Sequence, residues 1–311
     1  MSSRPIAVLT GPTGTGKTDI ALALAREFPL EIVSVDSAQV YRGLDIGSAK
    51  PSAEIRARVP HHLVDLVEPG ARYSAGQFVR DAAHAIGDIE ARGRVPLLVG
   101  GTMLYLRALT GGIAALPEGD ARLRTDIDAE AARVGWPALH ARLVGIDPVA
   151  AARIHPNDAQ RIQRALEVHA VGGRPISELQ TVTKPALERE FLVCALLPQD
   201  RARLHAALEL RFAQMMSAGL LDEVRGLYAR GDLTDEHPAI RAVGYRQLWA
   251  HLAGSYSLDV AVARAVAATR QLAKRQMTWL RSMANIRTFD PYDAQSFVGV
   301  RESLMGAFYL L

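Results

Sequence analysis

The sequence predicts an α/β fold in which a parallel sheet is flanked by helices and interrupted by an all-helical insertion. Short apolar runs alternate with helical patterns over residues 1–116, which indicates βαβ units and therefore a parallel sheet. From residue 117 to 187 only amphipathic helical segments follow. An apolar run at 191–197 then returns the chain to the sheet.

The first predicted strand, 6–10, leads into a glycine-rich turn and a helix at 17–27. The turn has the pattern G-x-x-x-x-G-K-T of a phosphate-binding loop, in which backbone N–H groups and the helix N-terminus surround an anion. We therefore expect a P-loop NTPase-like sheet, a di- or triphosphate ligand, and Mg²⁺ bound by the Thr18 hydroxyl. The predicted phosphate-binding residues are Gly11, Pro12, Thr13, Gly14, Thr15, Gly16, Lys17 and Thr18.

The elements that follow repeat the alternation of strand and helix. The run at 95–99 ends in Gly100-Gly101-Thr102, where glycines permit a close backbone approach to a ligand. In chain order the pattern predicts strands at 31–35, 62–67 and 95–99, and helices at 74–92 and from residue 103 onward.

The insertion divides one core into two stretches of sequence. We assign residues 1–116 and 188–311 to the core, and 117–187 to the helical insertion. Asp200 is placed to cap a long helix that ends near residue 219, because aspartate accepts hydrogen bonds from the first N–H groups of a helix. The chain then looks mostly helical to residue 279, and the tail after Thr288 has too little periodicity to predict an element.

Composition excludes several classes of protein. The 311 residues carry a net charge of +3 and one cysteine, Cys194, which excludes a disulfide framework and a cysteine-based zinc site. No apolar run reaches the length of about 18 residues that a membrane helix needs. The first strand begins too close to the N-terminus for a signal peptide, so we expect a cytoplasmic protein with no membrane partner.

Asp36 is the first catalytic candidate, because it follows a strand beside the phosphate loop, where parallel sheets collect their ligands. It could act as a base or a magnesium ligand, and an ordinary turn aspartate is the alternative. The run at 95–99 does not end in the aspartate typical of hydrolases, which favours group transfer. Arg211 shares a helix face with Leu204 and Leu208, so its charge either reaches solvent or points into a cleft.

Basic residues gather in three places. Arg270, Lys274 and Arg281 fall within about 40° of one another on a helix, which suits a nucleic-acid backbone or an ordinary solvated face. Two more clusters of arginine and glutamine lie at 160–164 and 241–246.

Six motifs together resemble one family. They are GPTGTGKT at 11–18, SVDSAQVYRGLDIGSAKP at 34–51, LLVGGTMLY at 97–105, DPVAAARIHPNDAQRIQRALEV at 147–168, RAVGYRQLW at 241–249 and TRQLAKRQMTWLR at 269–281. In this order, over nearly the whole chain, they are similar to the tRNA dimethylallyltransferase family, also called isopentenyl-tRNA or IPP transferases. The resemblance implies transfer of a dimethylallyl group from dimethylallyl diphosphate to N6 of the adenosine 3′ to the anticodon, in tRNAs that read codons beginning with U.

By the same resemblance, the insertion would grip the tRNA anticodon stem-loop. The residues that the likeness assigns to tRNA are Asp36, Ser37, Ala38, Gln39, Thr102, Arg124, Gln160, Arg161, Ile162, Gln163, Arg164, Arg241, Ala242, Val243, Gly244, Tyr245, Arg246, Lys274, Arg275, Gln276, Met277, Thr278, Trp279, Leu280 and Arg281.

The implied reaction gives the core residues their roles. Asp36 would take the proton of the adenine amine, and Thr13 would hydrogen-bond the bridging oxygen of the diphosphate. Lys17, Arg211 and Mg²⁺ near Thr18 would stabilise the charge of the departing diphosphate.

Two other functions fit part of the sequence. A small-molecule or nucleoside kinase would use the phosphate loop on ATP but leave the basic clusters unexplained. A non-catalytic RNA-binding protein would leave the intact loop unexplained. We expect a monomer, because no sequence pattern indicates a dimer interface.

Overall fold

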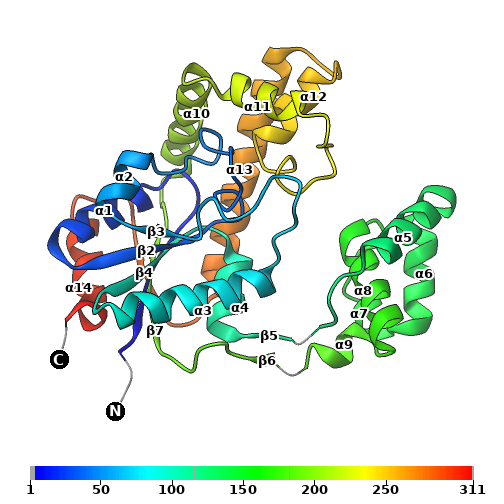
Figure 1. Cartoon of the computed structure of the whole chain (residues 1–311), viewed down its shortest axis with the longest axis horizontal. Coiled ribbons are helices and arrows are strands. Elements are labelled where there is room, and N and C mark those ends of the chain that lie inside the picture. Colours follow the sequence, from blue (N-terminus) through cyan, green and yellow to red (C-terminus); the bar gives the residue numbers. More distant parts are fainter. Residues whose placement is uncertain (1–3, 115, 182, 310–311) are drawn as a thin grey trace. The chain divides into compact units, whose positions relative to one another are not determined.

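The structure is a computed structural model that describes residues 4–114, 116–181 and 183–309 (Figure 1). Its contacts divide the chain into two compact units. The sheet unit comprises Met1–Thr110 and Ala186–Leu311, and the helical unit comprises Gly111–Pro185. No helix in the described ranges is long and apolar enough to cross a membrane.

A six-stranded sheet in which all neighbouring strands run parallel forms the centre of the sheet unit. In spatial order the strands are β3 (His61–His62), β2 (Leu30–Val35), β4 (Val95–Gly100), β1 (Ile6–Thr10), β7 (Phe191–Leu196) and β8 (Ile286–Phe289). Every residue of β1, β2 and β4 is buried, as expected for a sheet covered on both faces. The predicted α/β fold class is confirmed.

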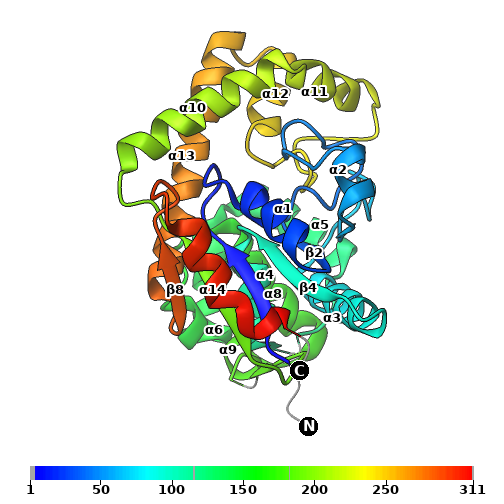
Figure 2. The ribbon, with the colours of Figure 1, turned by 90° about the vertical axis from the view of Figure 1, so that its left-hand side faces the viewer.

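Helices cover both faces of this sheet. α3 (Ala75–Ala91) and α4 (Met103–Gly111) share an apolar core with one face. α1 (Lys17–Glu27) and α14 (Ser296–Phe308) pack on the other, and Figure 2 shows α14 crossing in front of β1. Because β1 lies inside the sheet, the loop that follows it opens where the carboxyl ends of β2 and β4 also meet.

A further apolar core of the sheet unit joins four helices to the segment after β2. The helices are α10 (Arg201–Ser217), α11 (Leu220–Ala229), α12 (Tyr245–Leu252) and α13 (Leu258–Ser282). Val40, Tyr41 and Leu44 enter this core, so it anchors the stretch that begins at Asp36. The predicted cap of α10 is confirmed, because the Asp200 carboxylate accepts the N–H groups of Ala202 and Arg203.

The helical unit packs five helices around its own apolar core. They are α5 (Ala121–Val134), α6 (Trp136–Ile146), α7 (Pro148–Ala151), α8 (Ala159–Gly172) and α9 (Ile176–Leu179). The unit also contains an antiparallel pair, β5 (Ile113–Ala114) with β6 (Thr183–Lys184). The prediction of an all-helical 117–187 is wrong at 183–184, because two-residue strands are too short to show alternation.

The predicted strand at 62–67 is also wrong, because β3 stops after His62. Leu63 and Asp65 adopt left-handed backbone angles, with φ of 62° and 56°, which a strand cannot contain. A single parallel bridge between Tyr41 and Val67 is what remains of the pairing. Directly before this stretch lies the short helix α2 (Ala53–Arg58), which was not predicted from the sequence.

The tail after Thr288 is more regular than expected. β8 extends the sheet to Phe289, and α14 then buries Val300, Leu304, Ala307 and Phe308. These four positions have helical spacing, so the signal was present in the sequence, although weakened by the polar and small residues between them.

Candidate active site

The phosphate loop joins β1 to α1 and has the backbone of an anion cradle. Gly14 and Gly16 have positive φ angles of 81° and 73°, and a Cβ on Gly14 would lie 2.7 Å from Leu208 Cδ2. The Thr15 hydroxyl donates to the Pro12 carbonyl at 2.9 Å and fixes the curve of the loop. Since Gly16 begins α1 without a side-chain cap, the first N–H groups of the helix stay available to an anion.

Lys17 and Arg211 bring positive charge to the loop. The Lys17 ammonium donates to the Pro12 carbonyl at 2.8 Å. Burial lowers the pKa of Lys17 from 10.5 to about 8, the charge of Arg211 lowers it too, and Asp36 opposes the shift. Burial likewise lowers the pKa of Arg211, against the pull of Asp36 and Asp19. Arg211 therefore lines a cleft and does not reach out into bulk solvent. A negatively charged ligand in the cleft would stabilise the desolvated charges of both Lys17 and Arg211.

Asp36 lies at the carboxyl end of β2 and lines the same cavity. Its Oδ1 accepts the N–H groups of Ala38 at 2.8 Å and Gln39 at 3.2 Å. This turn holds the carboxylate in one orientation. Among the described residues its hydrogen bonds all use Oδ1, and none uses Oδ2.

The end of β4 brings a third backbone segment to this point. A Cβ on Gly100 would lie 2.1 Å from the Val35 carbonyl oxygen, so only glycine permits the approach. The Thr10 hydroxyl donates to the Gly100 carbonyl at 2.9 Å. The Thr102 hydroxyl accepts the Ser37 N–H at 3.0 Å, which ties this turn to the one that carries Asp36.

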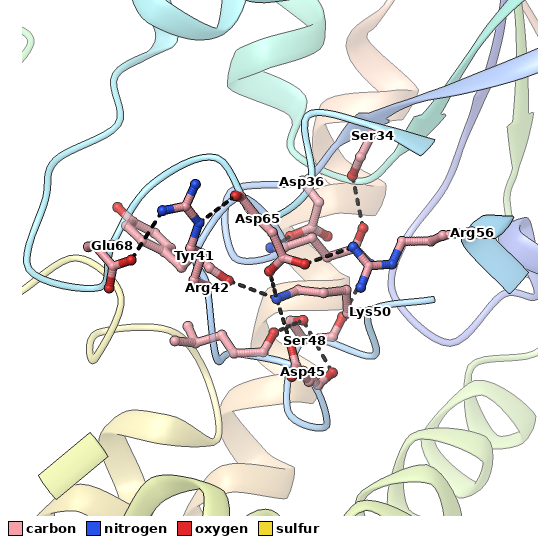
Figure 3. Close-up of polar contacts among 12 residues, drawn as sticks. Ser34, Asp36, Tyr41, Arg42, Asp45, Ser48, Lys50, Arg56, Asp65 and Glu68 are labelled. Carbon is pink, nitrogen blue, oxygen red and sulfur yellow. Dashed lines mark hydrogen bonds and ion pairs between the residues drawn. The ribbon is translucent and has the colours of Figure 1, made fainter. Parts of the chain in front are cut away.

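The segment from Asp36 to Pro51 is held by polar contacts of the buried Lys50, which the sequence did not predict. Figure 3 shows the Lys50 ammonium between Asp45 and Asp65, at 2.6 Å from a carboxylate oxygen of each. Lys50 also donates to the Tyr41 carbonyl at 2.8 Å, and its side chain is 2% exposed. Burial would raise the pKa of Asp65, but Lys50 and Arg56 outweigh it and lower that pKa. Lys50 is one of only four lysines in the chain, and this rarity was the one feature of the sequence that could have drawn attention to it.

Glu223 of α11 holds the turn within that segment. Its carboxylate accepts the N–H groups of Asp45, Ile46 and Gly47 at 2.7–3.2 Å, and the Tyr245 hydroxyl donates to it at 2.5 Å. A Cβ on Gly47 would lie 2.6 Å from the Tyr245 ring, so the two segments are in tight contact.

These segments enclose one large cavity of about 750 Å³ in the sheet unit. Its lining includes the phosphate loop, Asp36, Arg211 and one side of α13. Of the residues that the likeness assigned to tRNA, those lining it are Asp36, Ser37, Ala38, Gln39, Thr102, Arg241, Ala242, Val243, Tyr245, Arg275, Gln276 and Trp279.

The three cations of the predicted basic stripe of α13 have different surroundings. Lys274 and Arg281 are exposed, whereas Arg270 is bound to Glu209 at 2.8 Å. Met277 and Leu280 are buried in apolar cores. Thr278 is exposed, and Gly244 and Arg246 lie at the start of α12 outside the cavity lining.

In the helical unit, two expected tRNA contacts are bound to a buried carboxylate. Glu167 is fully buried and pairs with Arg124 at 2.7 Å and with Arg164 at 2.6 Å. Ile162 is buried in the core, while Gln160 and Arg161 are exposed. Gln163 donates to Asp128 at 2.6 Å.

A metal at the phosphate loop would be bound by the Thr18 hydroxyl together with phosphate oxygens of the substrate. Thr18 lines the cavity at the start of α1, where the phosphates of a ligand would complete the shell, a pattern that suits Mg²⁺. Across the described ranges, no group of three or more His, Cys, Asp or Glu could hold a metal by itself.

Comparisons with known proteins agree with one another. A family model described as IPP transferase matches residues 39–283, and one described as isopentenyl transferase matches 5–59. A tRNA dimethylallyltransferase of Methylibium petroleiphilum is 59% identical over 286 residues, covering 90% of this chain and 87% of the relative. One of Bordetella petrii is 54% identical over 284 residues, covering 90% of both chains.

Solved structures show the same likeness. The full-length tRNA isopentenylpyrophosphate transferase of Bacillus halodurans aligns with a TM-score of 0.72 at 35% identity, covering 98% of this chain and 97% of that one. A eukaryotic dimethylallyltransferase captured acting on tRNA aligns with a TM-score of 0.80 at 28% identity, covering 96% and 78%.

Proposed function

This chain belongs to the IPP transferase family, and we propose from that premise that it is a tRNA dimethylallyltransferase. Its substrates are dimethylallyl diphosphate and the N6 amine of the adenosine 3′ to the anticodon, in tRNAs that read codons beginning with U. The observation that carries the proposal is one cavity lined by an anion-binding loop, a carboxylate and residues of α13.

The reaction forms a bond between N6 and the allylic carbon and breaks the bond from that carbon to the diphosphate oxygen. The adenine amine is a weak nucleophile, so a base that takes its proton in the transition state is worth about 10²–10⁴-fold. Asp36 would be this base, which is supported by its place in the cavity lining and by an Oδ2 that its backbone hydrogen bonds do not use. The target adenine must leave its stack, which costs least in a loop.

Negative charge grows on the diphosphate as it leaves. The backbone N–H groups of residues 14–18, the Lys17 ammonium and the Arg211 guanidinium would stabilise it, and the Thr13 side chain would hydrogen-bond the bridging oxygen. Mg²⁺ bound beside the Thr18 hydroxyl would supply further charge neutralisation.

The helical unit would bind the anticodon stem-loop, with exposed Gln160 and Arg161 as the contacts of α8. Lys274 and Arg281 would bind the RNA backbone from α13. We keep a monomer as the expected assembly, and the cytoplasm as the expected compartment because tRNA is the proposed substrate.

Nucleoside analysis of tRNA tests the proposal. We would incubate the protein with unmodified tRNA, Mg²⁺ and labelled dimethylallyl diphosphate, digest the RNA, and look for N6-(dimethylallyl)adenosine. A parallel incubation with labelled ATP and nucleosides tests the kinase alternative. Label on ATP acceptors and none on tRNA would replace the proposal with a kinase.

A further inference from the structure

Gln276 of α13 is placed differently from its exposed neighbours. Its side chain is buried, at 9% exposed, whereas Lys274 and Arg275 are exposed. Its Oε1 accepts the backbone N–H of Thr13 at 3.0 Å. Its Nε2 donates to the Gly101 carbonyl at 2.8 Å. One amide therefore joins α13, the phosphate loop and the turn after β4.

The contact with Gly101 leaves little room for a side chain at that position. A Cβ at this position would lie 2.6 Å from Gln276 Nε2 and 3.0 Å from the Gly11 carbonyl oxygen. Positions 101 and 276 are thus matched to each other and to the phosphate loop, although 175 residues separate them in the chain.

This contact fixes the direction of the Thr13 backbone N–H. Thr13 lies in the middle of a loop whose N–H groups must keep fixed directions to surround an anion. Its own N–H donates to the side-chain oxygen of Gln276, and a partly buried N–H that lost this acceptor would be stabilised by moving to another one. The loop would then have to reorder before each binding event, which weakens affinity.

We propose that Gln276 is a positioning residue that holds the phosphate loop in the geometry that binds the donor diphosphate, and not a contact to tRNA. The inference rests on the proposed function, because it names the diphosphate as the ligand of the loop. It also gives α13 two separate faces. The exposed one carries Lys274 and Arg281, and the buried one fixes the loop.

Replacing Gln276→Met tests this, since methionine keeps the length of the side chain and removes both hydrogen bonds. The matched control is Gln271→Met, on the exposed side of the same helix. We expect the dissociation constant for inorganic diphosphate with Mg²⁺, and the KM for dimethylallyl diphosphate, to rise about tenfold in the first variant. The Kd for tRNA should stay within about twofold in both variants.

The opposite pattern would overturn the inference. A raised Kd for tRNA with unchanged diphosphate affinity would make Gln276 an RNA contact, and no change in either would leave it a packing residue. If Gln276→Met does not fold, Gly101→Ala disturbs the same contact from the other side and should raise the diphosphate Kd in the same way. Unchanged diphosphate affinity in that variant would equally reject the inference.

The wild-type protein separates this outcome from a failure of the proposed function. Diphosphate binding is measured without tRNA or transfer, so the role of Gln276 in the loop can be read directly. Wild-type protein that binds diphosphate but does not prenylate tRNA would refute the function while leaving the loop experiment interpretable.

Discussion

At the scale of single residues, the site depends on groups whose charge is costly in their surroundings. Lys17 and Arg211 both have pKa values lowered by burial, and Asp36 is the carboxylate that partly offsets them. A bound diphosphate would offset the desolvation cost of both cations by bringing negative charge to them.

Replacing Asp36→Asn should lower kcat by about 10²–10⁴-fold, because the amide cannot accept the amine proton. Asparagine keeps an oxygen for the N–H groups of Ala38 and Gln39, so the Kd for tRNA should stay unchanged. Single-turnover rates and filter binding measure the two. The control is Asp222→Asn, at an exposed position of α11 outside the cavity lining. Turnover near wild type in the Asp36 variant would remove it as the base.

Diphosphate affinity should depend on the protonation of Lys17. Its pKa is about 8 in the free protein, and a bound anion raises it, so the protonated form binds better. Binding should therefore take up a proton near pH 8, and affinity should weaken as pH rises above that value. Calorimetry in buffers of different ionisation enthalpy measures the uptake. Lys17→Arg should abolish it, because arginine stays protonated, whereas uptake that persists in this variant would assign the proton to another group.

At the scale of elements, much of the site could be predicted because it lies on strand ends with strong local patterns. The phosphate loop follows a short apolar strand, and Asp36 follows another, so parallel pairing alone brings them together. Glu223 and Gln276 could not be assigned these roles, because their partners are backbone groups that lie 177 and 175 residues away in the chain. A strand pattern at 62–67 likewise misled, since tertiary contacts hold Asp65 at a positive φ.

The exposed cations of α13 should make salt-dependent contacts with RNA. Lys274→Ala and Arg281→Ala should each reduce the slope of log Kd for tRNA against log salt by about 0.7–0.9. Arg270→Ala is the matched comparison, because its guanidinium is bound to Glu209 and should contribute less. Filter binding across a salt series gives the slopes. Identical slopes in all three variants and the wild type would make this stripe an ordinary solvated face.

At the scale of the whole molecule, the division into a sheet unit and a helical unit gives each its own core. The loss of strand patterns predicted the helical stretch, and the family resemblance assigned Arg124 and Arg164 to tRNA. What the sequence could not show is that a single carboxylate, Glu167, binds both guanidiniums within the helical unit. Identical residue types serve RNA binding and internal pairing, and only burial separates the two.

Removing that carboxylate should destabilise the helical unit. Glu167→Ala leaves two arginines without their partner, and because both guanidiniums are partly exposed the cost should be about 2–3 kcal/mol, near or below the range for a fully buried pair. Thermal unfolding followed by circular dichroism measures it. Glu178→Ala, which removes an exposed pair with Arg174, is the control and should change stability by less than about 1 kcal/mol. Equal stability of the two variants would contradict a structural role for Glu167.

The order of strands has a consequence for folding during synthesis on the ribosome. β1 is made first, yet one of its two partners, β7, begins 181 residues after β1 ends. At about 5–20 residues per second, that edge of β1 waits roughly 10–35 s for its neighbour. The helical unit lies wholly within this interval and can fold as it emerges. The nascent chain can thus carry a folded helical unit before the sheet is complete.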